Sequence, residues 1–502
     1  MDALSKKIYL ILEPPTEEDP RADKQRILDG LPEGIGHVVM GLNAMRSLYP
    51  ICEKANWRIT VSLAWNGSCW EIYRIEPGDT RIRSFGIAAD LGSTTVCMRL
   101  IDLNTGRVLA QSSAYNRQIA FGEDILTRVF YCKDQSARLE EVRLATIETF
   151  REVMDELSQK SGLDLTACGA MVVAGNTTMM HFLLGLDPFS VFASPYAPRA
   201  SEFGFLRGEE LGLPIEGYVY CYPCLANYLG GDIISGMIAT GLPEREGISV
   251  FLDIGTNGEL VVGNRDFLLS GAGAAGPALE GGVVKTGMRA VDGAVSAVRL
   301  EEGTFHLTVL GGGTPKGLCG SGIVDLIAQL YLAGYIDLRG KFTQDAPHLV
   351  EENGNIGIGY GPGLYFWESD IQAFLNTKAA ANTMVEYMLD QIGIPMEQVD
   401  RFYVAGAFGT HLDKESAVTI GLYPDMERQR IISAGNSSLE GAQLLLCNKD
   451  KLVLLESILG KMEYVQFGAV ADFIDRMRAA KAIPHTDMRR YPSVQEKLAK
   501  RK

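Results

Sequence analysis

The chain has 502 residues, of which 46% are hydrophobic and 22% charged, and its formal net charge is −15 at pH 7. This length predicts about three structural units, and the acidic balance argues against general binding to nucleic acid or to an anionic membrane, which needs a positive face. No secretory signal is recognisable, no apolar run reaches the roughly 18 residues of a membrane span, and the nine cysteines are too scattered for a disulfide framework. We therefore expect a cytoplasmic protein.

Residues 1–84 are predicted to form a small α+β domain. Its predicted elements, in order, are a strand at Lys7–Leu12, a helix from about Ala22, and strands near Trp57–Trp65 and Cys69–Ile75. The segment EPGDTRIRS is rich in turn-forming residues and poor in hydrophobic ones, which predicts a boundary near Ser84.

Longer elements follow in residues 85–245. FGIAADLG and the strands after it indicate a meander, with Asn104-Thr105-Gly106 as its tight turn. A helix is expected from about Leu139 to Lys160, with Gly162 as its C-cap, and then the buried strand AMVVAGN. This order predicts a mixed α/β lobe.

The same order recurs in residues 246–475. ISVFLDIGTNGELVVG is again a strand, a carboxylate, a glycine turn and a strand, and a helix from about Thr377 to Gln391 leads to the strand RFYVAGAFG. The markers are Asp90 and VVAGN in the first copy, and Asp253 and YVAGAFG in the second. This internal duplication predicts two related lobes with a cleft between them.

Residues 476–502 form a basic tail. We predict a solvated or fraying end, with a docking tail as the alternative.

Two turns have the composition of phosphate-binding turns. Gly92 and Gly255 let the backbone bend where a side chain would obstruct it. Asp90 and Asp253, the candidate catalytic carboxylates, would repel phosphate, but they suit the positioning of water and of a hard cation such as Mg²⁺. The predicted phosphate contacts are Ser93, Thr94, Thr95, Thr256, Asn257 and Glu259. In a third turn, VAGAFG, the two glycines Gly406 and Gly409 are predicted to support a flat adenosine.

The segments DLGSTT, DIGTNGE and VAGAFG resemble the two phosphate motifs and the adenosine motif of the actin, Hsp70 and sugar-kinase superfamily. Within it, four segments resemble the reductive activators of corrinoid-dependent proteins: YLILEPPTEEDPRADKQRIL (9–28), VVAGNTTMMHFLLGLDP (172–188), GPALEGG (276–282) and GLCGSGIVDLIA (317–328). The resemblance implies duplicated ribonuclease-H-like lobes, ATP and Mg²⁺ as ligands and slow ATP hydrolysis. It also implies that residues 1–84 are the family's middle domain.

The activity implied by this resemblance is the ATP-dependent return of an inactive Co(II) corrinoid to Co(I), with a corrinoid protein or corrinoid methyltransferase as partner. Such activators typically begin with a ferredoxin domain that holds a [2Fe–2S] cluster with four cysteines. Residues 1–84 contain only Cys52 and Cys69, without that spacing. We therefore expect a separate low-potential electron carrier. The alternatives are a non-redox, ATP-gated interaction module and a small-molecule kinase of the same fold.

The pair Cys221 and Cys224, in CYPC, leaves three interpretations open: two buried thiols, ligands of an Fe–S cluster shared across a homodimer interface, or a redox dithiol. Asp232 is either an acid near the γ-phosphate or a helix N-cap. The segment GAGAAGPALEGG (271–282) is either a lobe-closing loop or a surface loop. Three further residues are expected to be local: His181 and His411 as hydrogen-bonding groups, and Cys319 at a helix start.

Overall fold

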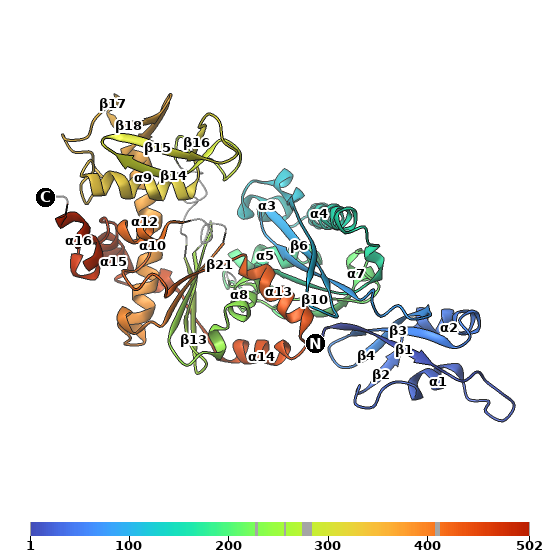
Figure 1. Ribbon diagram of the computed structural model, residues 1–502. Helices are drawn as coiled ribbons and strands as arrows, with labels where there is room; N and C mark the ends of the chain where they lie inside the picture. The colour runs from blue at the N-terminus through green and yellow to red at the C-terminus, as the bar shows by residue number, and fades with distance from the viewer. Residues whose placement is uncertain (1, 226–228, 256–257, 274–283, 407–411, 501–502) are drawn as a thin grey trace. The chain divides into compact units, whose positions relative to one another are not determined.

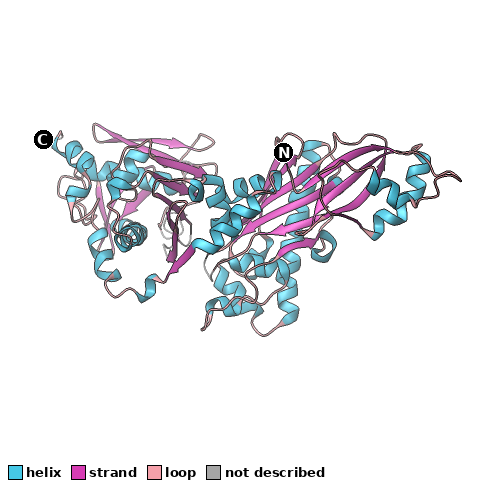
Figure 2. Cartoon of the chain, turned by 90° about the horizontal axis from the view of Figure 1, so that it is seen from below, coloured by secondary structure: helices cyan, strands magenta, loops and turns pink. Residues whose placement is uncertain are grey.

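The computed structural model, shown in Figures 1 and 2, describes residues 2–225, 229–255, 258–273, 284–406 and 412–500. The chain divides into two compact units. Unit 1 comprises Met1–Ala239 and Ser437–Gly460, and unit 2 comprises Thr240–Asn436 and Lys461–Lys502. Within the described ranges, every helix is too short or too polar to span a lipid bilayer.

The N-terminal part of unit 1 is a four-stranded sheet with its own hydrophobic core. Its elements are β1 (Ser5–Ile11), α1 (Asp23–Asp29), β2 (Val38–Met40), α2 (Leu42–Lys54), β3 (Arg58–Trp65) and β4 (Trp70–Pro77). The strand order is β1-β3-β4-β2. The predicted strands and first helix are present, but α2 was not predicted, because Pro50 inside it is a residue that usually ends a helix.

This small sheet is joined to the rest of unit 1 by a buried carboxylate. Glu71 lies 2.6 Å from Arg207 Nη2 and accepts a hydrogen bond of 2.7 Å from the Tyr218 hydroxyl. Because a buried charge is costly unless it is paired and hydrogen-bonded, these contacts tie the two parts together.

The larger sheet of unit 1 has the order β7-β6-β5-β8-β10-β9. Its strands are β5 (Phe85–Leu91), β6 (Thr95–Asp102), β7 (Val108–Tyr115), β8 (Cys168–Gly175), β9 (Gly204–Arg207) and β10 (Tyr218–Cys221). The helices of this part are α3 (Ile125–Cys132), α4 (Ser136–Ser161), α5 (Thr177–Leu184), α6 (Phe189–Phe192), α7 (Gly208–Leu211), α8 (Gly231–Thr240), α13 (Ser437–Cys447) and α14 (Lys451–Lys461). The predicted end of α4 is confirmed, since Gly162 adopts the left-handed conformation at its C-cap.

The main sheet of unit 2 has the order β21-β20-β11-β12-β13-β22. Its strands are β11 (Ser249–Ile254), β12 (Gly258–Gly263), β13 (Leu268–Gly273), β20 (Arg401–Ala405), β21 (Ile431–Gly435) and β22 (Met462–Val465). Two small sheets consist of β14 (Ala294–Glu301), β15 (Thr304–Val309) and β16 (Gly317–Leu318), and of β17 (Leu349–Glu352), β18 (Asn355–Gly361) and β19 (Leu364–Trp367). The helices are α9 (Gly320–Ala333), α10 (Glu368–Gln391), α12 (Lys414–Thr419), α15 (Phe473–Ala480) and α16 (Pro492–Ala499).

The predicted duplication is present in the two main sheets (strands in magenta, Figure 2). Each begins with an antiparallel meander, β5-β6-β7 or β11-β12-β13, and adds two parallel strands beside the first strand of that meander. The correspondence extends to single residues. Asp90 lies opposite Ala174 and Asp253 lies opposite Ala405, and each alanine is followed by a glycine.

The units differ from the predicted lobes in residues 437–460. Residues 437–460 belong to unit 1, although the second lobe was predicted to run from 246 to 475. Helix α13 packs on the unit-1 sheet, where Leu446 contacts Gly86, and it crosses α8 at Gly441 (Figure 1). A Cβ atom on Gly441 would lie 2.0 Å from the Ser235 carbonyl oxygen, so this crossing requires glycine.

The basic tail is not a fraying end. Ile483, Tyr491 and Val494 are buried in the core of unit 2. Lys378, on α10, is fully buried, and its ammonium donates to the carbonyls of Ala480, Ala482 and Pro484. The predicted solvated segment is therefore wrong for the described part of this tail, because apolar contacts and a buried lysine hold it.

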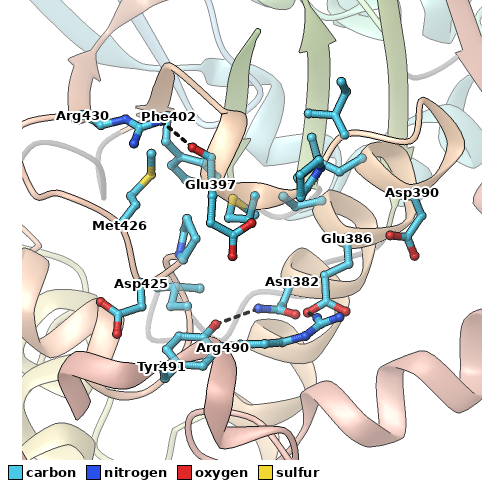
Figure 3. A pocket seen from close by; sticks show the side chains of 17 residues that line it. Asn382, Glu386, Asp390, Glu397, Phe402, Asp425, Met426, Arg430, Arg490 and Tyr491 are labelled. Atoms are coloured by element: carbon cyan, nitrogen blue, oxygen red, sulfur yellow. Dashed lines mark hydrogen bonds and ion pairs between the residues drawn. The ribbon is translucent and has the colours of Figure 1, made fainter. Parts of the chain in front are cut away.

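The tail also forms one wall of a cavity of about 390 Å³ within unit 2. In Figure 3, Arg490 and Tyr491 face Asn382 and Glu386 of α10. Asn382 Nδ2 donates to the Tyr491 hydroxyl at 3.1 Å, and Arg490 forms an ion pair with Glu386. These contacts hold Arg490 and Tyr491 of the C-terminal segment against the long helix α10.

Candidate functional site

Asp90 is the penultimate residue of β5 and is half-buried. Its Oδ1 accepts a hydrogen bond of 2.8 Å from the hydroxyl of Ser438, in the first turn of α13. Burial and, secondly, the charge of Asp90 raise the pKa of Cys97, its cross-strand neighbour, to about 12. The Ser438 hydroxyl donates to this carboxylate from the first turn of α13, so the positive end of that helix lies on the same side.

The turn after Asp90 directs its carbonyl groups into the protein. The Thr95 carbonyl accepts from the Gly92 N–H at 3.1 Å, and Asn116 donates to the carbonyls of Gly92 and Thr94 at 2.9 and 2.8 Å. The Ser93 carbonyl accepts from Arg128 Nη1 at 2.6 Å. Because a trans peptide points its N–H away from its C=O, this arrangement turns N–H groups outward, as an anion site requires.

Gly92 is needed for the shape of this turn. A Cβ atom there would lie 2.5 Å from the Thr95 carbonyl oxygen. The three predicted phosphate contacts, Ser93, Thr94 and Thr95, are half-buried at the end of the hairpin. Their role as phosphate contacts stays a prediction.

The second turn places two carboxylates side by side. Asp253 on β11 lies directly opposite Glu259 on β12, so their side chains share one face of the sheet. Adjacent carboxylates repel each other unless a proton or a cation lies between them. Glu259, predicted as a phosphate contact, is therefore better suited to a cation. Thr256 and Asn257 lie outside the described residues, and Gly255 lies at the edge of that gap.

Gly406 follows β20 and has a φ angle of +86°. A Cβ atom there would lie 2.9 Å from Asp253 Oδ1, so a side chain at this position would press on the carboxylate. The close approach to Asp253 therefore explains a glycine at position 406 independently of the predicted contact with adenosine. Gly409, His411 and most of the segment 271–282 lie outside the described residues.

The sulfur atoms of Cys221 and Cys224 are not available to solvent. The two residues are 0% and 2% exposed, and burial raises the pKa of their thiols to about 12 and about 11. In the described chain, no group of three or more His, Cys, Asp or Glu side chains could hold a metal ion. A shared cluster needs exposed thiolates, so the structure supports the interpretation of two buried thiols.

The other predicted residues are local. His181 Nδ1 lies 2.7 Å from the Thr177 carbonyl, and its Nε2 accepts the Arg199 N–H at 3.1 Å. Cys319 is the N-cap of α9, as predicted. Asp232 is neither the first residue nor the N-cap of α8 but lies in its first turn, where Oδ1 accepts the Ile233 N–H at 2.9 Å.

Comparison with known proteins identifies the family of the chain. Models of the RACo linker region, the RACo middle region and the C-terminal domain of RACo, the ASKHA domain, match residues 1–82, 85–245 and 247–495. The corrinoid activation enzyme RamQ of Eubacterium limosum is 33% identical, over 78% of this chain and 69% of that protein. The chain belongs to the RACo family.

Two further relatives support the assignment of this chain to the RACo family. A Co(II) methylated amine-specific corrinoid protein reductase of Methanosarcina barkeri is 25% identical, over 73% of this chain and 71% of that protein. The solved structure of a reductive activator for corrinoid, iron-sulfur protein is 36% identical, with a TM-score of 0.89, and the match covers 98% of this chain and 81% of that one. These matches confirm the predicted family and fold.

The family models correct one name. Residues 1–84 were predicted to be the family's middle domain, but the RACo middle region is 85–245, and residues 1–82 match the linker region. The small size of the first domain and its place before the two candidate phosphate-binding turns fit either region of the family.

Asn116 and Arg128 of this RACo-family protein were missed by the sequence analysis. Both side chains are fully buried behind the first turn. The only local signal is an arginine on the buried face of α3, beside Val129 and Cys132. Such a position predicts that the arginine makes a buried polar contact, but it does not identify the group that the arginine contacts.

We expect stability to fall above pH 9 because of the buried thiols. The pKa of Cys221 is raised from an ordinary 9.0 to about 12, so above pH 9 the unfolded chain loses a proton that the folded chain keeps. One such group lowers the free energy of unfolding by about 1.4 kcal/mol per pH unit between the two pKa values. Urea unfolding between about pH 9.5 and 11 should therefore show a shallower decline in Cys221→Ala than in the wild type. Equal slopes would contradict a protonated buried thiol.

Proposed function

We propose that this protein uses ATP binding and slow ATP hydrolysis to reactivate a corrinoid protein, by assisting the reduction of Co(II) to Co(I). The observation that carries the proposal is the pair of matching turns, with Asp90 and Asp253 at equivalent positions of a duplicated fold. Membership of the RACo family and the names of the relatives support the choice of a corrinoid protein as partner.

In the proposed mechanism, the N–H groups of the first turn hold phosphate oxygens. The adjacent carboxylates of the second turn, Asp253 and Glu259, would supply oxygen ligands that suit Mg²⁺, and Asp90 would have the corresponding role at the first turn. When bound, Mg²⁺ supplies positive charge that neutralises the phosphates. Asp90 and Asp253 would orient the attacking water, so the protein contributes positioning and electrostatics rather than covalent chemistry.

The reduction adds one electron to cobalt, and each 59 mV of unfavourable potential costs about a factor of ten in the equilibrium constant. ATP binding can oppose this cost only if it favours one conformation of the complex with the corrinoid protein over another. We propose that the electron comes from a separate low-potential carrier, because the two cysteines of CYPC are buried. A homodimer stays a prediction.

A non-redox, ATP-gated module is the second candidate. It is favoured by one observation, namely that the described residues offer no cluster of three or more metal-ligating side chains. In that case ATP would rearrange the corrinoid protein without any passage of electrons.

One assay separates these candidates. The protein is mixed anaerobically with a methylated-amine corrinoid protein or a corrinoid iron–sulfur protein in the Co(II) state, with a mild donor that alone leaves most cobalt as Co(II), with and without ATP. We expect the absorption of Co(I) only with ATP and donor together. An ATP-dependent change of the Co(II) spectrum without a donor would favour the non-redox module. If cobalt is unaffected under all conditions with both partners, the proposal fails. Iron and sulfide analysis of this protein alone, before mixing, checks for a bound cluster.

A further inference from the structure

We propose that Arg128 is a positioning residue for ATP: from helix α3 it holds the peptide between Ser93 and Thr94 so that the Thr94 N–H faces a phosphate. This inference rests on the nucleotide site proposed for the first turn. It adds a residue that belongs to neither the turn nor its strands.

Arg128 is fully buried, yet in the described chain it forms no ion pair with a carboxylate. Its guanidinium donates to four neutral oxygens. They are the carbonyls of Ser93, Gly122 and Glu123, at 2.6, 2.8 and 3.2 Å, and Gln118 Oε1 at 3.3 Å. The contact with Ser93 is the shortest of the four.

A buried charge without a direct ion pair is costly, so packing alone does not explain an arginine at this position. The contact with Ser93 has two effects on the turn. It fixes the orientation of the Ser93–Thr94 peptide, and therefore the direction of the Thr94 N–H. It also polarises that peptide, because hydrogen bonds in a chain strengthen one another, which makes the N–H a better donor to an anion.

Two further buried side chains fix Arg128 in place. Gln118 contacts Arg128 through Oε1, and its Nε2 donates to Thr146 Oγ1 on α4 at 2.5 Å. Asn116 accepts the Gln118 N–H at 3.1 Å and binds the carbonyls of Gly92 and Thr94. Asn116, Gln118 and Arg128 thus form one buried network that spans the back of the turn. A phosphate bound in front would meet a backbone that is already oriented.

The test compares affinities for ligands with and without phosphate. Arg128→Met keeps much of the volume and removes the donors, and Arg26→Met is the matched control, because Arg26 is also buried but lies in the N-terminal sheet domain. We expect the Kd for Mg²⁺–ATP of Arg128→Met to rise about 10- to 30-fold, and that for adenosine to change by less than about twofold. Arg26→Met should leave both within about twofold of the wild type. Calorimetric titration and thermal melting give affinity and folding.

A structural role would weaken adenosine and ATP together, so equal losses for the two ligands would overturn the inference. It is also overturned if Arg128→Met binds ATP within about twofold of the wild type. If Arg128→Met does not fold, Arg128→Lys replaces it, because lysine keeps the charge but cannot reach all four oxygens. An ATP-selective loss of about 3- to 10-fold is then expected, and no loss would contradict the proposal. A wild type that binds no ATP would refute the proposed function and this inference together.

Discussion

Replacing Asp90 or Asp253 by asparagine should lower ATP hydrolysis at saturating Mg²⁺–ATP by about 100-fold or more. Asparagine keeps the shape of each side chain, and at position 90 it keeps an oxygen for the Ser438 hydroxyl. It removes the negative charge that would hold the cation and orient the attacking water. Phosphate release measures the rate.

The two variants should differ in the Mg²⁺ concentration that gives a half-maximal rate of hydrolysis. Asp253 shares its face of the sheet with Glu259, so Asp253→Asn should raise the Mg²⁺ concentration needed for half-maximal rate. Asp266→Asn is the matched control, since Asp266 is an exposed carboxylate in the β12–β13 turn of the same sheet. Hydrolysis that continues at the wild-type rate in both variants would exclude these carboxylates from the reaction.

Replacing Lys378 by methionine should cost about 3 to 5 kcal/mol of the free energy of unfolding of unit 2. The ammonium donates to the carbonyls of Ala480, Ala482 and Pro484, and methionine would leave all three buried and unpaired. Burial lowers the pKa of Lys378 to about 7, so a measurement at about pH 6 compares the variant with the charged lysine. Urea unfolding gives the loss, and limited proteolysis after residue 480 shows whether the tail detaches.

Lys285→Met is the control for this change. Lys285 lies in the same unit, but its side chain is 60% exposed and pairs with Glu352, whose side chain is 54% exposed. Its removal should cost less than about 1 kcal/mol. A similar small cost for Lys378→Met, with the tail still resistant to protease, would show that apolar contacts alone hold the C-terminal segment.

Local patterns predicted the repeated parts of this molecule. An apolar strand, an aspartate and a glycine turn are adjacent in sequence, so Asp90 and Asp253 could be placed without knowledge of tertiary contacts. The same holds for the turn at Gly106, whose N–H donates to the Asp102 carbonyl at 2.7 Å, and for the helix end at Gly162. In each case the deciding interaction spans only a few residues.

The missed parts depend on contacts between distant segments. Ser438 reaches Asp90 across nearly 350 positions of sequence, and Arg128 reaches Ser93 across 35. The basic composition of residues 476–502 indicated solvent, but Lys378 and the apolar residues Ile483, Tyr491 and Val494 determine where that segment lies. The composition of a segment indicates how polar its surface is. Whether the segment packs against the rest of the protein depends on the burial of a few of its residues.

The return of residues 437–460 to unit 1 has a consequence for biosynthesis. After Ala239 emerges from the ribosome, Thr240–Asn436 must be made before α13 can cover the sheet face at Gly86 and contact α8. At a synthesis rate of about 5 to 20 residues per second, that face of the sheet would stay uncovered for about 10 to 40 s. The nascent first unit therefore carries an uncovered apolar surface during the synthesis of most of the second. A chain truncated before Ser437 would keep that surface exposed, and we expect it to bind chaperones or aggregate even though β5–β10 are complete.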